Sequence, residues 1–312
     1  MSETVSFSFI MPAYKAKFLH LSIESILMQS YRDFELIIVN DASPENLKTI
    51  IEQYSDKRIN YQENGTNIGG TDLVANWNHC IQFAKNDYII LATDDDMFEP
   101  DFLIKAVDLI NKYPNINIIR SGVRKIDEQG RTLDIEFPLK EYMTGREFTL
   151  YYAKGGTISC ISNYIFERKE LLSIGGFISF PHAHYSDDAT ALTMSINGIA
   201  CIPTNELNFR VSNINLSNRN DQFLAIEQLH ASEAYVTWFF KHMSIYEINP
   251  NDFFQRACYG GIKNRYINMV EKLIDKIPFS KAFLAIKTIY SAKHLFKKDK
   301  LKLTANWIIN KL

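Results

Sequence analysis

The stretch DYIILATDDDMFEP, residues 87–100, organises the rest of the chain. Its apolar run Tyr88–Leu91 is typical of a strand buried on both faces of a sheet. Three consecutive carboxylates, Asp94, Asp95 and Asp96, follow this run, and a helix with Pro100 in its first turn is expected next. Because ligands of open α/β sheets bind outside the carboxyl ends of the strands, the acidic cluster is predicted to lie at a ligand-binding edge.

Adjacent carboxylates repel one another, and a hard cation would neutralise them. Carboxylate and water oxygens are the ligands that Mg²⁺ and Mn²⁺ prefer, and such an ion commonly arrives with the phosphates of a substrate. The alternative interpretation is a solvated acidic turn before a helix N-terminus, where Asp is favoured in any case. The buried strand in front of the cluster favours a functional site.

Composition describes an ordinary globular protein. The 312 residues are 46% hydrophobic and 22% charged, and the net charge of −2 gives no sign of nucleic-acid binding. The four cysteines are widely spaced, so we expect reduced thiols in a cytosolic protein. We expect neither a signal peptide, because the start lacks a basic segment, nor a spanning helix, because no apolar run reaches ~18 residues. A cytoplasmic protein is therefore predicted.

The first hundred residues alternate between strand and helix patterns, which predicts a mostly parallel sheet covered by helices on both faces. Further strands are expected at residues 115–125, 157–166 and 199–202. The earlier strands of this α/β fold are predicted at residues 5–11, 34–39, 58–62 and 88–91.

Polar side chains follow three of these early strands: Tyr14, Asp41 and the cluster 94–96. A stacking ring, an acceptor for a base N–H group and a metal site at one sheet edge would together suit a nucleotide. Taken singly, Tyr14 has an alternative role in packing and Asp41 as a turn or helix cap.

The chain resembles family 2 glycosyltransferases. The motifs that carry the resemblance are PAYK at residues 12–15, QSYRDFELIIVNDAS at 29–43, Asn67-Ile68-Gly69 and TDDD at 93–96, within a similarity that covers about residues 5–215. The resemblance implies a GT-A, Rossmann-like fold, a nucleotide-diphosphate sugar donor, a divalent cation and inversion at the anomeric carbon.

The resemblance also implies roles for individual residues. Asp95 is the expected direct metal ligand, with Asp94 and Asp96 in support, and Mn²⁺ or Mg²⁺ as the ion. Asp41 is expected to meet the base, which is compatible with uracil and favours a UDP-sugar. The remaining donor contacts implied are Pro12, Ala13, Tyr14, Asn67, Asn76, Asp94 and Arg210.

Four positions depart from the family pattern. Lys15 stands where Asn is frequent, Thr93 replaces the first Asp of the metal motif, Asn76 lies where an Arg is expected, and Ser212 replaces a His after Arg210. Arg210 remains a candidate for balancing phosphate charge, and a structural salt bridge is the alternative.

Asp187 and Asp188 open a predicted helix about ninety residues after the acidic cluster. Read alone, they suit a helix N-cap. The resemblance implies that the second acid, Asp188, is the general base that deprotonates an acceptor hydroxyl, with Asp187 beside it.

Two domains are predicted: a glycosyltransferase domain over residues 1–218, divided into a nucleotide-binding half (1–100) and an acceptor half (101–218), and a helical C-terminal region over 219–312. Residues 279–312 contain eight Lys and one Asp among apolar residues. Such a tail suits contact with an anionic inner-membrane surface, and a solvated helix packed on the core is the alternative.

The predicted activity is transfer of a hexose-type sugar to a hydroxyl of a glycan or lipid-linked glycan in polysaccharide biosynthesis. A sugar-phosphate nucleotidyltransferase is a rival, although no Gly-rich triphosphate loop with Arg or Lys follows the first strand. The rival from another class is a non-catalytic nucleotide-sugar-binding scaffold on a decayed transferase fold, which the departures at Thr93, Asn76 and Ser212 favour.

Overall fold

The computed structural model describes residues 5–213, 222–246 and 252–311. The chain forms two compact units. A sheet unit consists of residues 1–148, 157–179 and 186–212, and a helical unit consists of residues 149–156, 180–185 and 213–312. The predicted boundary at 218/219 lies outside the described residues, so it stays a prediction.

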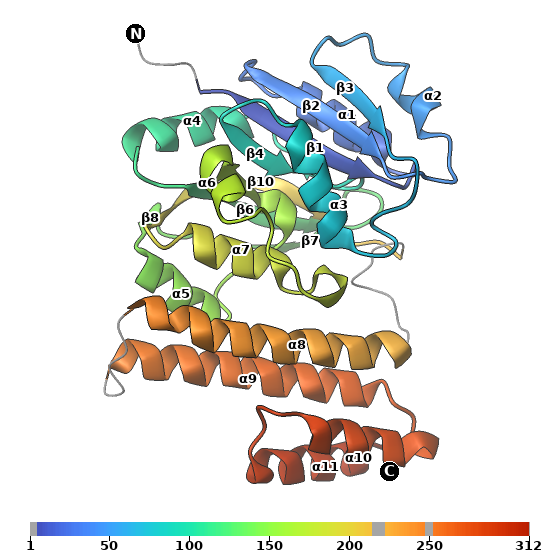
Figure 1. The fold of residues 1–312 in the computed structure, drawn as a ribbon, viewed down its shortest axis with the longest axis vertical. Coiled ribbons are helices and arrows are strands. Elements are labelled where there is room, and N and C mark those ends of the chain that lie inside the picture. The colour runs from blue at the N-terminus through green and yellow to red at the C-terminus, as the bar shows by residue number, and fades with distance from the viewer. Residues whose placement is uncertain (1–4, 214–221, 247–251, 312) are drawn as a thin grey trace. The chain divides into compact units, whose positions relative to one another are not determined.

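Four parallel strands form the first half of the sheet unit, in the order β3-β2-β1-β4 (Figure 1). This confirms the predicted mostly parallel sheet. Strands β1, β2 and β4 are mostly hydrophobic because both of their faces are covered, and the side chains of Phe9, Ile37 and Ile90 are fully buried. Strand β3, at the edge of the sheet, is only half-buried. The strands are β1 (Phe7–Ala13), β2 (Phe34–Asn40), β3 (Ile59–Glu63) and β4 (Tyr88–Leu91), with helices α1 (Leu19–Leu27), α2 (Leu47–Ile51), α3 (Leu73–Cys80) and α4 (Phe102–Lys112) between or after them.

The second half of the sheet continues beyond β4 through β9, β6 and β10. Strand β9 (Tyr164–Glu167) is antiparallel to both neighbours, and the long strand β10 (Ile199–Arg210) runs parallel to β6 (Ile118–Ile126). The short strands β5 (Met97–Phe98), β7 (Thr132–Ile135) and β8 (Tyr142–Met143) pair at the margins, and helices α6 (Arg168–Ser173) and α7 (Ser186–Met194) complete this part. Helix α5 (Gly145–Ala153) begins in the sheet unit, and its residues 149–153 belong to the helical unit.

One predicted strand is wrong in its first part. Residues 157–160 form no strand and Ile161–Asn163 form a 3-10 turn, so strand pairing begins only at Tyr164. The backbone amide and carbonyl of Ile158 are bonded instead by the buried pair Glu136 and Arg120. Side chains thus take the place of a strand partner for this segment.

The point at which the strand order reverses lies between β1 and β4. The chain proceeds from β1 through β2 to β3 on one side, and then returns to place β4 on the other side of β1. In open α/β sheets, a ligand-binding crevice is expected at such a reversal, at the carboxyl end of the sheet. Tyr14 and Asp94 to Asp96 follow these two strands.

The helical unit contains α8 (Gln222–His242), α9 (Phe253–Asp275), α10 (Ala282–Ser291) and α11 (Lys297–Lys311), as the sequence predicted for a helical extension. Aromatic rings join its segments: Tyr235 stacks on Tyr185 with ring centroids 4.5 Å apart. Trp307 of α11 is buried and donates its indole N–H to the carbonyl of Ile274. None of the helices in the described ranges is both long and apolar enough to span a membrane.

Candidate functional site

Asp94 connects the exits of β1 and β4. Its Oδ2 accepts hydrogen bonds from the backbone amides of Tyr14 (2.8 Å) and Lys15 (2.7 Å). The side chain is buried, and burial followed by the charge of Asp95 raises the pKa of Asp94 to about 6, against the lowering effect of the two amides. Asp94 thus sets the spacing of the two loops that border the crevice.

Asp95 and Asp96 are buried beside each other. Asp96 Oδ1 accepts from the Arg210 amide at 3.0 Å. Its Oδ2 is buried and accepts no well-formed hydrogen bond from the described residues, although the Thr93 and Ser162 hydroxyls are near enough to Asp96 to favour its charged form. Burial and the charge of Asp95 raise the pKa of Asp96 to about 7. Burial likewise raises the pKa of Asp95, although Lys15 and Arg210 oppose the shift. Two crowded carboxylates with an unpaired buried oxygen are an environment that a cation would stabilise.

The carboxylates of Asp95 and Asp96 suit a metal ion that protein and substrate phosphates would bind together. Within residues 5–213, 222–246 and 252–311, no three His, Cys, Asp or Glu side chains are grouped to hold a metal. Mg²⁺ and Mn²⁺ do not require such a cage, because they are commonly held by one or two carboxylates with water and substrate phosphates as the other ligands. The carboxylates of Asp95 and Asp96 fit that arrangement.

Asp41 holds the loop that follows β3. Its Oδ1 accepts from Asn64 Nδ2 (2.7 Å) and from the Ile68 amide (2.9 Å), and its Oδ2 accepts from the Gly69 amide (2.7 Å). Asp41 is only 3% exposed. Its position at the sheet edge is as expected, and its carboxylate shapes the edge by fixing this loop.

Two other expected donor contacts are also engaged within the fold. Asn67 Oδ1 caps the Gly70 amide at 2.6 Å, and the nearly fully buried Asn76 accepts from Asn64 through its Oδ1. Tyr14, in contrast, is 38% exposed, with its carbonyl held by the Ser43 hydroxyl. The ring of Tyr14 therefore has the exposure that stacking on a ligand requires.

Arg210 joins two backbone segments through hydrogen bonds. Its buried guanidinium donates to the carbonyls of Asp95 (2.9 Å), Asp127 (3.1 Å) and Glu128 (3.3 Å), and it lies over the ring of Phe18. These contacts give Arg210 a structural role, which its hydrogen bonds to backbone carbonyls carry. The guanidinium places positive charge behind the acidic cluster while it fixes the backbone of that cluster.

Asp187 and Asp188 begin α7, as expected. The Asp188 amide donates to Asp187 Oδ1 at 2.9 Å, and Asp188 is 7% exposed. Cys160 lies near both the Asp187–Asp188 pair and the acidic cluster. Burial is the main cause that raises the pKa of its thiol well above the ordinary value, and the charges of Asp96 and Asp187 add to it. Both acidic groups are therefore close enough to one thiol to act on it.

Sequence reasoning missed Asn78, which joins α3 to the segment that leads to α7. Asn78 Oδ1 accepts from the Phe177 amide (2.7 Å), and its Nδ2 donates to the Phe177 carbonyl (3.0 Å). Gly176 has a φ of +86°, and a Cβ there would lie 2.3 Å from Asn78 Oδ1. One feature of the sequence could have pointed to this contact: Asn78, a polar residue, lies on the apolar face of its helix between Val74 and Ile81.

Comparison with known proteins agrees with this architecture. The family model described as "Glycosyl transferase family 2" matches residues 8–173, more than half of the chain. The chain belongs to glycosyl transferase family 2. This confirms the resemblance found in the sequence motifs.

Relatives with detectable sequence identity match only part of the chain. EpsE of Bacillus subtilis (strain 168) is 38% identical over 112 residues, which are 35% of this chain and 39% of EpsE. The uncharacterized glycosyltransferase MJ1057 of Methanocaldococcus jannaschii is 35% identical over 153 residues, 47% of this chain and 51% of that protein. The chain thus spans about half or less of the length of these curated relatives.

Solved structures extend the similarity over the whole fold. S. aureus TarS 1-349 in complex with UDP has a TM-score of 0.58 at 16% identity, covering 98% of this chain and 92% of that chain. The complex of TarS 1-349 with UDP-GlcNAc gives a TM-score of 0.61 at 16% identity, with 98% and 93% covered. At this identity the likeness shows the GT-A-type fold, including the helical extension.

Substituting Asn78 tests its structural role. Asn78→Ala leaves the Phe177 amide and carbonyl without these partners, and we expect a loss of about 2 kcal/mol in the free energy of unfolding. The measurement is urea denaturation of the variant and the parent chain. Gln82→Ala is the control: it removes an exposed amide that donates a solvent-exposed hydrogen bond to the Asn78 backbone carbonyl, and it should change stability by less than about 0.5 kcal/mol. Equal effects of both substitutions would contradict the role assigned to Asn78.

Proposed function

We propose that the chain is an inverting, metal-assisted glycosyltransferase that moves a hexose-type sugar from a nucleotide diphosphate to an acceptor hydroxyl. The observation that carries this proposal is the acidic cluster Asp94–Asp96 at the reversal of strand order, with an unpaired buried oxygen on Asp96. The family membership supports glycosyl transfer as the reaction class.

The donor nucleotide is proposed to lie over the carboxyl ends of β1 and β2. The half-exposed Tyr14 ring would stack on the base, while Pro12, Ala13 and the loop held by Asp41 would line the nucleoside pocket. A UDP-sugar is favoured because the structurally similar TarS has been solved with UDP and with UDP-GlcNAc. Asp41 would then act on the base through the loop that it positions.

Asp95 and Asp96 would hold the metal ion, and Asp94 would keep their loop against the end of β1. A bound Mn²⁺ or Mg²⁺ ion supplies charge stabilisation for the leaving diphosphate. Arg210 would hold the backbone of the cluster through the Asp95 carbonyl. Lys15, whose charge acts on both Asp94 and Asp95, would add a positive group at the same edge.

Asp188 is proposed as the general base. It would take the proton of the acceptor hydroxyl as that oxygen attacks the anomeric carbon from the side opposite the diphosphate, which gives inversion. Asp187 accepts the Asp188 amide and so fixes the first turn of α7. The position of the carboxylate should matter as much as its basicity, because the attack requires aligned reacting atoms.

A contact of α10 and α11 with an anionic membrane surface is a further part of the proposal. Phe283 and Phe296 are 82% and 63% exposed, and the same region carries eight Lys and one Asp between residues 279 and 312. Exposed aromatic rings beside lysines suit the boundary of an anionic bilayer. Buried Leu303 and Trp307 show that another face of α11 packs within the protein. A glycan linked to a lipid would suit such a contact.

The donor site is tested by a thermal-shift panel of nucleoside diphosphates and sugar nucleotides with and without Mn²⁺. A ligand at ~100 times its dissociation constant stabilises the folded chain by about 2.7 kcal/mol. We expect a Mn²⁺-dependent shift with UDP that Asp95→Ala abolishes. The exposed Asp101→Ala, close in sequence, is the control and should retain the shift. Absence of a shift with any nucleotide would contradict the transferase proposal.

The base is tested by Asp188→Asn. We expect turnover of a UDP-sugar to fall by a factor of about 100 or more, because the amide cannot accept the proton. The UDP-dependent thermal shift should remain, since the donor contacts are intact. Asp187→Asn should lower turnover less. Near-full activity of Asp188→Asn would refute the assignment.

The membrane contact is tested by cosedimentation with phosphatidylcholine vesicles that contain or lack phosphatidylglycerol. We expect binding only to the anionic vesicles, and Phe283→Ser with Lys287→Ser should weaken it, because both apolar and electrostatic contributions are reduced. Equal binding of the parent chain to neutral and anionic vesicles would exclude the electrostatic part of this proposal.

A further inference from the structure

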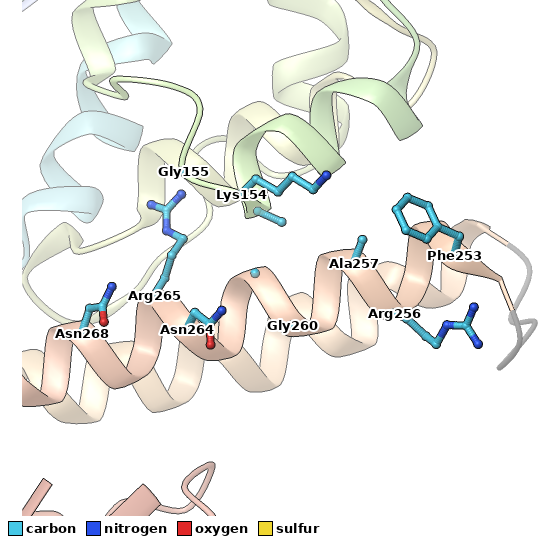
Figure 2. Close-up of a pocket in the computed structure, with 11 residues that line it drawn as sticks. Lys154, Gly155, Phe253, Arg256, Ala257, Gly260, Asn264, Arg265 and Asn268 are labelled. Atoms are coloured by element: carbon cyan, nitrogen blue, oxygen red, sulfur yellow. The ribbon is translucent and has the colours of Figure 1, made fainter. Parts of the chain in front are cut away.

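A second candidate binding site lies entirely within the helical unit. A cavity of about 520 Å³ lies between α9 and residues 153–155 at the end of α5 (Figure 2). Its lining includes three cationic residues, Lys154, Arg256 and Arg265, and two amide residues, Asn264 and Asn268. In Figure 2 the Arg256 side chain extends away from the Gly155 segment, whereas that of Arg265 extends toward it. None of the described residues lining this cavity is acidic, so its charge is positive without a balancing carboxylate in the wall.

Two adjacent glycines in α9 have different reasons for being glycine. At Gly261, an added Cβ would lie 2.5 Å from the carbonyl oxygen of Ala153, so close packing requires the absence of a side chain. At Gly260, which lines the cavity, an added Cβ would meet no atom within 4 Å. An interior glycine destabilises a helix relative to alanine, and packing offers no reason for it at Gly260. Space for a ligand is a reason that the cavity supplies.

The cations differ in how firmly they are held. Arg265 donates from Nη1 to the Tyr152 carbonyl at 2.7 Å, and its guanidinium lies 4.3 Å from the centre of the Tyr152 ring. Figure 2 shows Arg265 extending from α9 toward the Gly155 segment, and Lys154 on the same side of the helix. Because one side chain is fixed in advance, an anion bound there would order fewer groups.

An exposed ring completes the wall. Phe253, at the start of α9, is 69% exposed, and the Lys154 ammonium lies 5.9 Å from the centre of its ring. In Figure 2 Asn264 and Asn268 lie further along α9, on successive turns. The cavity therefore offers cations for an anion, amides for hydroxyl groups and an apolar ring face.

We propose that this cavity binds a phosphate-bearing carbohydrate. Guanidinium and ammonium groups together suit phosphate oxygens, amide side chains both donate to and accept from sugar hydroxyls, and a ring face suits the C–H face of a sugar. The phosphate belongs either to a soluble phosphorylated glycan or to the headgroup of a lipid. The inference concerns the helical unit alone and does not depend on the donor site proposed for the sheet unit.

The experiment titrates the full chain with glucose 6-phosphate and, separately, with glucose, following binding by calorimetry. The same chains are cosedimented with phosphatidylcholine vesicles that contain or lack phosphatidylglycerol. The variants are Lys154→Ser with Arg256→Ser, and Gly260→Leu, which fills the cavity. Lys272→Ser is the matched control, because it removes one exposed cation from the same helix outside the cavity. Asp95→Ala separates this site from the acidic cluster.

We expect glucose 6-phosphate to bind more tightly than glucose by about tenfold or more. The double variant and Gly260→Leu should each lose that preference, while Lys272→Ser and Asp95→Ala should keep it. Loss of anionic-vesicle binding in the cavity variants, with no binding of the soluble ester, would also support the site and identify a lipid headgroup as the source.

Three results would overturn the inference. One is equal weakening by Lys272→Ser and by the cavity variants, which would indicate general surface charge. Another is loss of glucose 6-phosphate binding in Asp95→Ala but in none of the cavity variants. That result would show that glucose 6-phosphate binds at the acidic cluster of the sheet unit. The third is the absence of any difference between cavity variants and parent chain for both probes. Gly260→Ala is the folding control for Gly260→Leu. Because alanine favours the helix over glycine, this variant should have a higher melting temperature than the parent chain.

Discussion

The candidate site depends on one constraint: β1 and β4 are neighbours, but the chain leaves them in opposite directions. A crevice at such a position has no backbone ladder to close it, so its two borders must be fixed by side chains. Asp94 does this by accepting the amides of both Tyr14 and Lys15. The next two carboxylates are then held at the crevice by the geometry of β4 and by the tie from Arg210 to the Asp95 carbonyl.

Two residues expected to contact a ligand, Asp41 and Arg210, also support the surface on which that ligand is predicted to bind. Asp41 uses both carboxylate oxygens on the loop at residues 64–69, and Arg210 distributes its guanidinium among three backbone carbonyls. Removal of either would leave several buried polar groups unpaired. The residues that combine exposure or unsatisfied atoms with the right position are fewer, and Tyr14 and Asp96 are the clearest of them.

The sequence predicted the parts of the fold that follow from local periodicity. The four parallel strands, the helices between them and the polar residues at their ends were all visible in the alternation of strand and helix patterns, and the resemblance to family 2 is confirmed. Contacts between distant segments were not visible. Asn78 lies 99 residues from its partner Phe177, and the capture of Ile158 by Glu136 and Arg120 is what prevents the predicted strand from starting at residue 157. The roles assigned to Asp95 and Asp188 stay predictions.

The two hydrogen bonds between the Asn78 side chain and the Phe177 backbone also restrict which residues can occupy these positions. The amide of Asn78 imitates a backbone peptide, so among ordinary side chains only Gln carries the same group, and Gln is one methylene too long for the same position. At Gly176 both the left-handed backbone and the lack of space exclude other residues. A change at either position therefore carries a cost in stability, because it removes hydrogen bonds to Phe177 or forces a side chain against Asn78. The two halves of the sheet unit are therefore matched at this contact, and a hybrid that exchanges one half should keep its stability only when Asn78 and Gly176 are both retained.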